Sequence, residues 1–216
     1  MWQKLTDFAQ QIHLPLTEYQ ARILVQYAQL VWQKKDFLNL TSAANLDEVI
    51  RRHICDGLQG AAQLSQLAQA AQKDSFSLID AGAGAGYIGL TVAIALPQAQ
   101  VTLVESIEKR CAFMRWVVLS LGIKNAQIKN IRLGQQKDLQ ADFVTERAMG
   151  QLPDIFAACL EAVRPGGIFM AYQAAPVPPQ TVAADKHGAA LYQETGYQLP
   201  EETRTRYLAL FRKGSI

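Results

Sequence analysis

From Phe76 onward, short apolar runs alternate with segments of helical periodicity, and this alternation limits the possible folds more than any other feature of the chain. The runs expected as strands are Phe76–Ala81, Gln100–Glu105, Ala126–Ile131, Ala141–Thr145 and Gly167–Tyr172. The helices expected between them are Tyr87–Leu96, Ile107–Leu121 and Pro153–Val163. Because strands that alternate with helices form βαβ units, the pattern predicts an α/β fold with a doubly wound, mostly parallel sheet.

The two ends of the chain carry different patterns. Thr17–Lys35 has apolar residues at helical intervals after a capping-box spacing, and Leu46–Arg52 continues into another helix that ends before Lys73. We therefore expect residues 1–73 to form a helical extension packed on a main domain of residues 74–216. The elements expected at the C-terminal end are a loop at Pro176–Pro179 and an antiparallel hairpin of Ala190–Tyr197 and Arg204–Arg212.

Composition and charge exclude several classes of protein. The 216 residues are 50% apolar and carry a formal net charge of +2, which is ordinary for a globular enzyme or binding protein. The three cysteines lie far apart and outside CxxC spacing, so we expect neither disulfides nor a metal site. The first residues lack the apolar core of a signal peptide, and no stretch reaches the roughly 18 apolar residues of a membrane span. These features predict a cytoplasmic protein, which we expect to be a monomer.

The first expected strand runs directly into a glycine loop, Gly82-Ala83-Gly84-Ala85-Gly86, which precedes a helix. Small residues are needed at such a loop because a bound nucleoside lies against the backbone, where Cβ atoms would hold it away. The glycine spacing fits a dinucleotide as well as S-adenosylmethionine, so the loop alone does not identify the ligand.

Asp80 in front of the loop and Glu105 at the end of the next strand narrow the choice of ligand. A carboxylate at Asp80 would attract the ammonium and sulfonium groups of S-adenosylmethionine and repel a pyrophosphate. Glu105 is placed to accept hydrogen bonds from ribose hydroxyls, which S-adenosylmethionine and NAD share. We expect S-adenosylmethionine as the cofactor, and the alternatives are a nicotinamide dinucleotide or a turn without a ligand.

Several short motifs surround this loop in a specific order. They are Asn39-Leu40-Thr41, Arg52-His53-x-x-Asp56, the glycine loop, Lys109-Arg110-x-x-Phe113 and Arg147-Ala148. In this order, the motifs resemble the bacterial small-subunit ribosomal RNA guanine-N7 methyltransferase family, also called the glucose-inhibited division protein B family. The resemblance extends from about Asp36 to Tyr172.

The resemblance implies a Rossmann-like class I methyltransferase that transfers a methyl group to N7 of a guanine in 16S ribosomal RNA. Its implied partner is 16S RNA or the 30S ribosomal particle. Family contacts to the cofactor fall on Gly82, Tyr87, the backbone at Leu133-Gly134, and Arg147. The full set of expected cofactor-binding residues is Asp80, Gly82, Gly84, Gly86, Tyr87, Glu105, Leu133, Gly134 and Arg147.

The chain departs from the family pattern at four places. No acidic residue stands in Ile131–Gln135, after the third expected strand. Gly57 replaces a common serine, Ile88 replaces a frequent proline, and Gln173 replaces a lysine. The missing acid and the missing lysine concern the binding of adenine and of substrate.

Candidates for catalysis follow from the chemistry of the implied reaction. Guanine N7 has a lone pair and no proton, so methyl transfer needs no general base and depends on proximity and orientation. Asp56 is expected to stabilise the cationic product. His53 is expected either to bind phosphate when charged or to join the helical extension to the sheet. Arg147 follows the fourth strand at the edge where such sheets bind ligands.

Candidates for RNA contact are mostly basic. Residues 101–150 carry eight Lys/Arg against five Asp/Glu, and Lys109, Arg110 and Arg132 are expected to meet phosphates there. A solvated helix face is the alternative for Lys109 and Arg110. Asn39 and Thr41 would contact a base or shape their own loop. Trp32, Phe113 and Trp116 lie at helical spacings and are expected in the core.

Two other functions remain open from the sequence. A methyltransferase for a small molecule or a protein would have a closed pocket under the helical extension and would not depend on RNA. A non-catalytic relative would bind RNA or cofactor without turnover.

Overall fold

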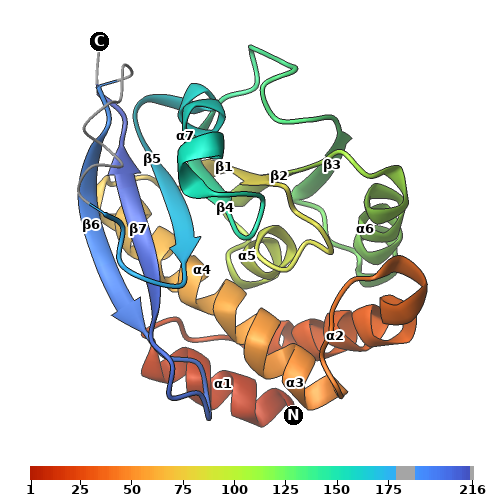
Figure 1. The fold of residues 1–216 in the computed structure, drawn as a ribbon. Helices are drawn as coiled ribbons and strands as arrows, with labels where there is room; N and C mark the ends of the chain where they lie inside the picture. Colours follow the sequence, from red (N-terminus) through yellow and green to blue (C-terminus); the bar gives the residue numbers. More distant parts are fainter. Residues whose placement is uncertain (179–187, 215–216) are drawn as a thin grey trace.

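The computed structural model describes residues 1–178 and 188–214, and its centre is a seven-stranded sheet of order β3-β2-β1-β4-β5-β7-β6 (Figure 1). The strands are β1 Phe76–Ala81, β2 Ala99–Glu105, β3 Ala126–Asn130, β4 Ala141–Glu146, β5 Val163–Gln173, β6 Ala190–Tyr197 and β7 Arg206–Arg212. Strands β1 to β5 are parallel, and β7 runs antiparallel to both of its neighbours. The doubly wound, mostly parallel sheet and the antiparallel C-terminal hairpin are thereby confirmed.

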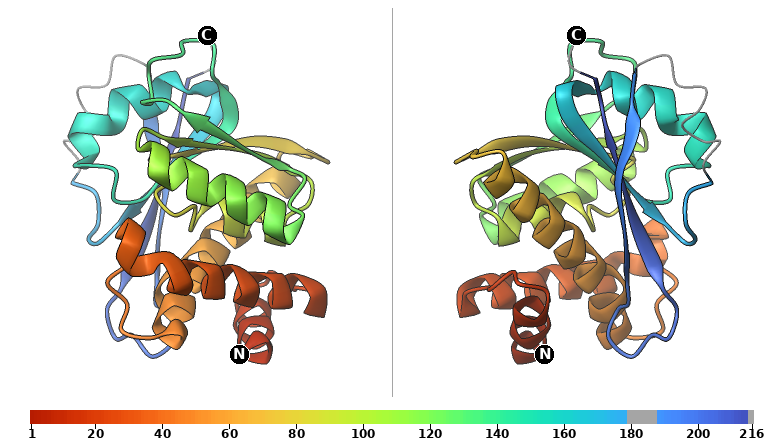
Figure 2. Two further views of the ribbon diagram at one scale, coloured as in Figure 1. Left: turned by 90° about the vertical axis from the view of Figure 1, so that its right-hand side faces the viewer. Right: turned by 90° about the vertical axis from the view of Figure 1, so that its left-hand side faces the viewer.

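Helices cover both faces of this sheet, but unequally. They are α1 Trp2–Gln11, α2 Glu18–Leu38, α3 Leu46–Val49, a π-helical turn at Ile50–Ile54, α4 Cys55–Ala70, α5 Gly89–Ala95, α6 Glu108–Leu121 and α7 Leu152–Glu161. Helix α7 packs on β4 and β5, whereas α5 and α6 pack on the opposite face and contact α4 and α2. Figure 2 shows the N-terminal helices gathered at one end of the molecule, with the sheet standing above them.

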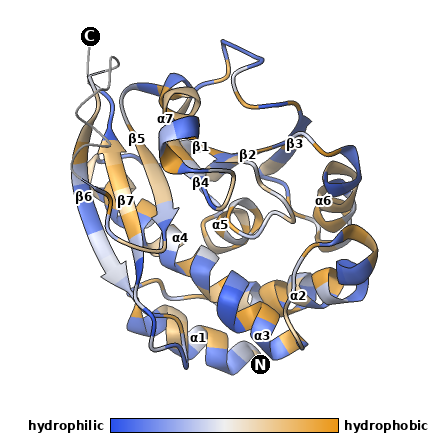
Figure 3. Cartoon of the chain, in the orientation of Figure 1, coloured by the Kyte–Doolittle hydropathy of each residue, from blue (hydrophilic) through white to orange (hydrophobic). Residues whose placement is uncertain are grey.

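Alternation along each strand divides the core into two parts. Leu78 and Leu103 pack into the larger core, which is shared with α1, α2, α4 and α5. The next residues along the same strands, Ile79 and Val104, pack into the smaller core under α7. The strands therefore read as continuous apolar runs, as expected for a sheet that is buried on both faces. Figure 3 shows these apolar strands and the hydrophilic residues on the outer faces of α1 and α2.

The helical extension is fastened to the glycine loop and its helix by side chains of α2. Thr17 and Gln20 form the capping box that begins α2, as their spacing predicts. The Gln20 amide also donates to the carbonyls of Ile94 and Ala95 at the end of α5, each at 3.0 Å. The buried Tyr27 hydroxyl donates to the carbonyl of Ala85 in the glycine loop at 2.9 Å. The extension therefore supports the loop that is expected to bind cofactor.

Several boundaries and one core assignment differ from the sequence prediction. The helix expected over Pro153–Val163 ends at Glu161, because Val163 already belongs to β5. Trp116 is 39% exposed, with the Lys34 ammonium over its ring, so its assignment to the core was wrong. Phe113 is buried as expected. Within the expected loop before the hairpin, Pro179 lies outside the described residues. Among the helices that the structure describes, none is long and apolar enough to cross a bilayer.

Candidate active site

A cleft of about 470 Å³ opens where β1, β2, β3 and β4 end at their carboxyl edge. This is the edge at which doubly wound sheets bind ligands, because the loops there diverge to either face. The cleft is lined by Gly82, Val104, Glu105, Ser106, Ile107, Arg110, Ile131, Arg132, Leu133, Ala148, Met149, Asp154, Ile155 and Ala158. We call this cavity the cofactor cleft.

Glu105 organises the rim of the cofactor cleft. Its two carboxylate oxygens accept the backbone N–H of Gly84 at 2.9 Å and that of Ile107 at 2.8 Å. The side chain is buried, and the Arg110 guanidinium lies 3.7 Å away. Each carboxylate oxygen keeps a second lone pair, which is free to accept from a ribose hydroxyl.

The glycines of the loop have separate reasons to be glycine. Gly82 and Gly84 have positive φ angles of 63° and 60°, and Gly86 has 89°. A Cβ at Gly84 would meet no atom closer than the Gly82 carbonyl oxygen at 3.9 Å, so the space above this backbone is open to a ligand. A Cβ at Gly86 would instead lie 2.7 Å from Leu90, which shows that Gly86 is required by packing.

Asp80 lies beneath the loop and does not line the cofactor cleft. Its carboxylate accepts the Gly89 N–H at 2.8 Å and the Thr145 hydroxyl at 3.3 Å, and it is 2% exposed. Burial raises the pKa of Asp80 to about 6, against the hydrogen bond from Gly89. The structure thus shows a contact of Asp80 with the start of α5, and its attraction for the cofactor stays a prediction.

The basic and loop candidates around β3 lie at different distances from the cofactor cleft. Arg110 and Arg132 line it, as does Leu133. Gly134 lines a neighbouring cavity and has a φ of 88° with open space around it. Lys109 is exposed on α6 and belongs to neither cavity. The side of the cofactor cleft formed by Arg110 and Arg132 therefore carries positive charge.

A second cavity of about 300 Å³ lies beside the first, and the two share Ala148. We call it the substrate pocket. It is lined by Asp56, Glu146, Arg147, Ala148, Gly150, Gln151, Leu152, Tyr172, Gln173, Ala174, Tyr197, Arg204 and Arg206. Ala148 has a φ of 59°, in the left-handed region that residues with a Cβ rarely adopt, and such strain collects at functional sites.

Asp56 and Arg147, both candidates from the sequence, meet in the substrate pocket. The Arg147 guanidinium donates to the Asp56 carboxylate at 2.7 Å, and Arg206 lies 3.4 Å from the same oxygen. The Tyr197 hydroxyl donates to the other Asp56 oxygen at 2.5 Å. Asp56 is 1% exposed and neutralised by these partners. These contacts hold Arg147 in place, and the expected role of Asp56 in stabilising the product stays a prediction.

His53 completes the support of Arg147 from the side of the extension. Its Nε2 lies 2.8 Å from the Thr41 hydroxyl, its Nδ1 lies 3.3 Å from the Arg147 guanidinium, and its ring stacks on Tyr87 at 4.1 Å. Burial first, and then the charge of Arg147, lower the pKa of His53 to about 3. An imidazole with this pKa is neutral at physiological pH, and its contacts favour the structural alternative, in which His53 joins the helical extension to the sheet.

Tyr87 and Arg147 do not line the cofactor cleft, although the resemblance implies contact with cofactor for both. The Tyr87 hydroxyl donates to the Leu40 carbonyl at 3.3 Å, and the Arg147 guanidinium lies 5.2 Å from the centre of the Tyr87 ring. Both side chains belong to the contact between the extension and the substrate pocket.

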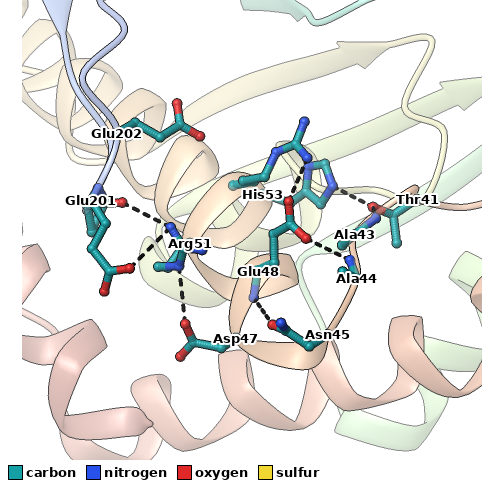
Figure 4. Close-up of polar contacts among 12 residues, drawn as sticks. Thr41, Ala43, Ala44, Asn45, Asp47, Glu48, Arg51, His53, Glu201 and Glu202 are labelled. Atoms are coloured by element: carbon teal, nitrogen blue, oxygen red, sulfur yellow. Dashed lines mark hydrogen bonds and ion pairs between the residues drawn. The ribbon is translucent and has the colours of Figure 1, made fainter.

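Figure 4 shows how the loop before the π-helical turn is held. The Thr41 hydroxyl accepts the Ala43 N–H at 3.0 Å, and Glu48 accepts the Ala44 N–H at 2.6 Å. Arg51 joins this region to the C-terminal hairpin through Asp47 and Glu201. Asn39 ends α2 in the left-handed conformation. Asn39 and Thr41 thus shape this loop, and contact of either residue with a base stays a prediction.

Glu146 is one of several residues of this site, with Tyr197, Arg204 and Arg206, that were not candidates from the sequence. It ends β4, is 1% exposed and lines the substrate pocket. Its carboxylate accepts from the Met149 N–H and from the Gln173 amide, each at 3.4 Å. An acidic residue at the carboxyl end of an expected strand was a usable signal, since Glu105 was identified in this way.

The cofactor cleft fits S-adenosylmethionine by its donors and its walls. The open backbone at Gly84 admits a nucleoside, Glu105 offers free lone pairs to ribose, and Ile107, Ile131 and Leu133 provide apolar surface for a base. Because Ile131–Gln135 contains no acidic side chain, the backbone there stays the expected partner of adenine. Within residues 1–178 and 188–214, no cluster of His, Cys, Asp or Glu is arranged to hold a metal ion.

Comparisons with known proteins agree with this architecture. The profile of the family described as rRNA small subunit methyltransferase G matches residues 20–204. The ribosomal RNA small subunit methyltransferase G of Limosilactobacillus fermentum is 34% identical over 212 residues, which cover 93% of this chain and 85% of that protein. The protein of the same name from Actinobacillus pleuropneumoniae serotype 5b is 32% identical over 213 residues, which cover 99% of this chain and 99% of that protein.

Solved structures share the fold at lower identity. TrmN from Thermus thermophilus superposes with a TM-score of 0.57 at 20% identity, over 73% of this chain and 48% of that one. TYW2 from M. jannaschii in complex with AdoMet gives a TM-score of 0.54 at 15% identity, over 73% of this chain and 77% of that one. Together with the match over residues 20–204, these findings show that the chain belongs to the rRNA small subunit methyltransferase G family of S-adenosylmethionine-dependent methyltransferases.

Proposed function

We propose that this chain methylates N7 of a guanine in 16S ribosomal RNA. The observation that carries the proposal is the pairing of two cavities across Ala148: a cofactor cleft with nucleoside-binding chemistry and a pocket with three arginines. S-adenosylmethionine supplies a methyl group on a sulfonium, which is already an electrophile. Because N7 of guanine carries a lone pair and no proton, the protein has to place the two reactants and has no proton to remove.

The arginines of the substrate pocket suit an RNA substrate. Arg147 is held by Asp56 and His53, so its guanidinium is oriented before any substrate binds. Arg204 and Arg206 stand at the same pocket. Contacts of arginine with phosphate position RNA without reading its sequence. We propose that these side chains hold the RNA backbone while the target base enters the pocket.

The test is transfer of a radiolabelled methyl group from S-adenosylmethionine to 16S RNA and to 30S particles, followed by mapping of the modified base. We expect label at N7 of one guanine. Binding of RNA should weaken steeply with salt, since phosphate contacts release counterions, whereas binding of S-adenosylmethionine should change little. Bound cofactor with no label in either substrate would contradict the proposal and favour a small-molecule or protein substrate. The proposed enzyme acts as a monomer in the cytoplasm, and light scattering tests its mass.

A further inference from the structure

Two buried carboxylates line the substrate pocket, and they differ in their partners. Asp56 has Arg147, Arg206 and Tyr197. Glu146 forms no ion pair within the described part of the chain, and its two hydrogen bonds, from Met149 and Gln173, are both 3.4 Å long. Such distances lie beyond the usual range for N–H···O bonds. A carboxylate that is 99% buried and so weakly bonded keeps most of its acceptor capacity unused.

We propose that Glu146 binds the target base, accepting hydrogen bonds from the N1–H and the N2 amino group of guanine. This inference rests on the proposed function and names the group that would select the base. Guanine presents two adjacent N–H donors on one edge, which match the two oxygens of a carboxylate. Adenine, cytosine and uracil each place an acceptor on that edge, and an acceptor would face the negative carboxylate. Glu146 would therefore favour guanine and reject the other three bases.

The charge that develops during the reaction strengthens this contact. As the bond from N7 to the methyl carbon forms, the bond from that carbon to sulfur breaks, and its electron pair stays on sulfur. The positive charge thus passes from the sulfonium to the guanine ring. A carboxylate bonded to the ring donors stabilises the cationic ring more than the neutral one, so the interaction is stronger in the transition state than in the bound substrate.

Protonation of Glu146 gives the proposal a second observable. Burial, and after it the negative charge of Asp80, raise the pKa of Glu146 to about 7, against the hydrogen bond from Met149. The titratable and charged groups around this pocket are Asp56, Asp80, Arg147, Cys159, Tyr172, Tyr197, Arg204 and Arg206. Only the ionised form accepts from both guanine donors. We therefore expect the kcat/KM of the wild-type protein for RNA to rise from pH 6 to pH 8.

The experiment compares the wild type with Glu146→Gln, Glu146→Asp and the control Glu161→Gln, which changes an exposed acid on α7. Methyl transfer to 30S particles is measured from pH 5.5 to 8.5, and the affinity for S-adenosylmethionine by calorimetry. We expect Glu146→Gln to retain the cofactor affinity, to lose roughly 10- to 100-fold in kcat/KM and to show a flat pH profile. Glu146→Asp should recover part of the rate and the pH dependence.

The outcomes separate this inference from the proposed function. Wild-type methylation of guanine with an undiminished rate in Glu146→Gln, or with the same pH profile in both proteins, overturns the role of Glu146 alone. A wild type that binds S-adenosylmethionine and labels no ribosomal RNA overturns both. Thermal unfolding of each variant shows whether a loss of rate is due to misfolding. If Glu146→Gln is misfolded, Glu146→Asp tests the proposal in its place. A Glu146→Asp protein that is folded but inactive contradicts the proposal.

Discussion

Asp56 receives the charges of two arginines and the hydroxyl of Tyr197, in a place that water does not reach. Changing Asp56→Asn leaves Arg147 without its counter-charge, whereas Arg206 keeps its ion pair with Glu202. Breaking such a buried pair costs about 3–5 kcal/mol of stability, and Arg147 loses the contact that orients it. We expect methyl transfer to fall by at least tenfold and the melting temperature to fall, while calorimetry finds the cofactor affinity unchanged, because Asp56 does not line the cofactor cleft. A fully active Asp56→Asn protein would contradict this role.

Glu105 supports a prediction at the other cavity. Its carboxylate holds the N–H groups of Gly84 and Ile107. Glu105→Ala would therefore loosen the glycine loop and also remove the expected contact to ribose. We expect the dissociation constant for S-adenosylmethionine to rise by roughly tenfold or more, measured by calorimetry. Glu108→Ala is the matched control, because Glu108 lies three residues along the chain and is exposed. Equal losses in the two variants would show that overall charge, and not this carboxylate, matters.

The positions of some site residues could be predicted from the sequence, and those of others could not. Glu105 and Gly84 do lie together, because the end of β2 and the glycine loop are neighbours at the same edge of the sheet. Asp80 lies near the end of β1, just before the glycine loop, but its side chain points beneath the loop, to Gly89 and Thr145. No spacing in the chain reveals which side of a strand end faces the cleft. The partners of Asp56 could not be predicted from the sequence, because Arg206 lies 150 residues further along the chain.

Helices and strands were predicted correctly where their signal lies in neighbouring residues of the sequence. The period of the apolar residues and the capping box gave α2 and the strands to within a few residues. Helix α1 and the π-helical turn at Ile50–Ile54 were not predicted from the sequence. The turn joins α3 to α4 without a break, and His53 lies within it, so its geometry bears on the support of Arg147. The division of the chain at residue 73 stays a prediction.

Gly57, which stands where the family commonly has serine, lies at the contact of α4 with α5, and the close packing there explains the glycine. A Cβ there would lie 2.6 Å from the Tyr87 carbonyl oxygen and 2.7 Å from Thr91 Cβ. Alanine in place of glycine usually stabilises a helix by about 1 kcal/mol, but here overpacking costs about 1–3 kcal/mol. We expect Gly57→Ala to lower the free energy of unfolding in urea, whereas Gln66→Ala on the exposed side of α4 should not. A stabilised Gly57→Ala protein would show that the two helices can move apart.

The buried negative charge of Glu146 lowers the folding stability of the molecule, and this loss can be measured because it depends on pH. Burial, followed by the charge of Asp80, raises the pKa of Glu146 from 4.5 to about 7. Between these values the native protein binds a proton that the unfolded chain has released. Stability therefore falls as the pH rises through this window, and the full cost is present above pH 7. Functional sites commonly lower stability in this way.

Glu146→Gln removes that cost because the amide is neutral at every pH. We expect urea unfolding to find the variant more stable than the wild type by on the order of 3 kcal/mol at pH 8, and equal to it near pH 4.5. Asp142→Asn is the control of opposite sign: burial alone would raise the pKa of Asp142, but hydrogen bonds from Lys73 and Ser77 outweigh it and hold the pKa at about 2. That carboxylate stabilises the fold above pH 4, so its loss should destabilise the protein at pH 8. A difference between Glu146→Gln and the wild type that stays constant from pH 4.5 to 8 would mean that Glu146 is ionised at no cost, and that the pocket already supplies a counter-charge.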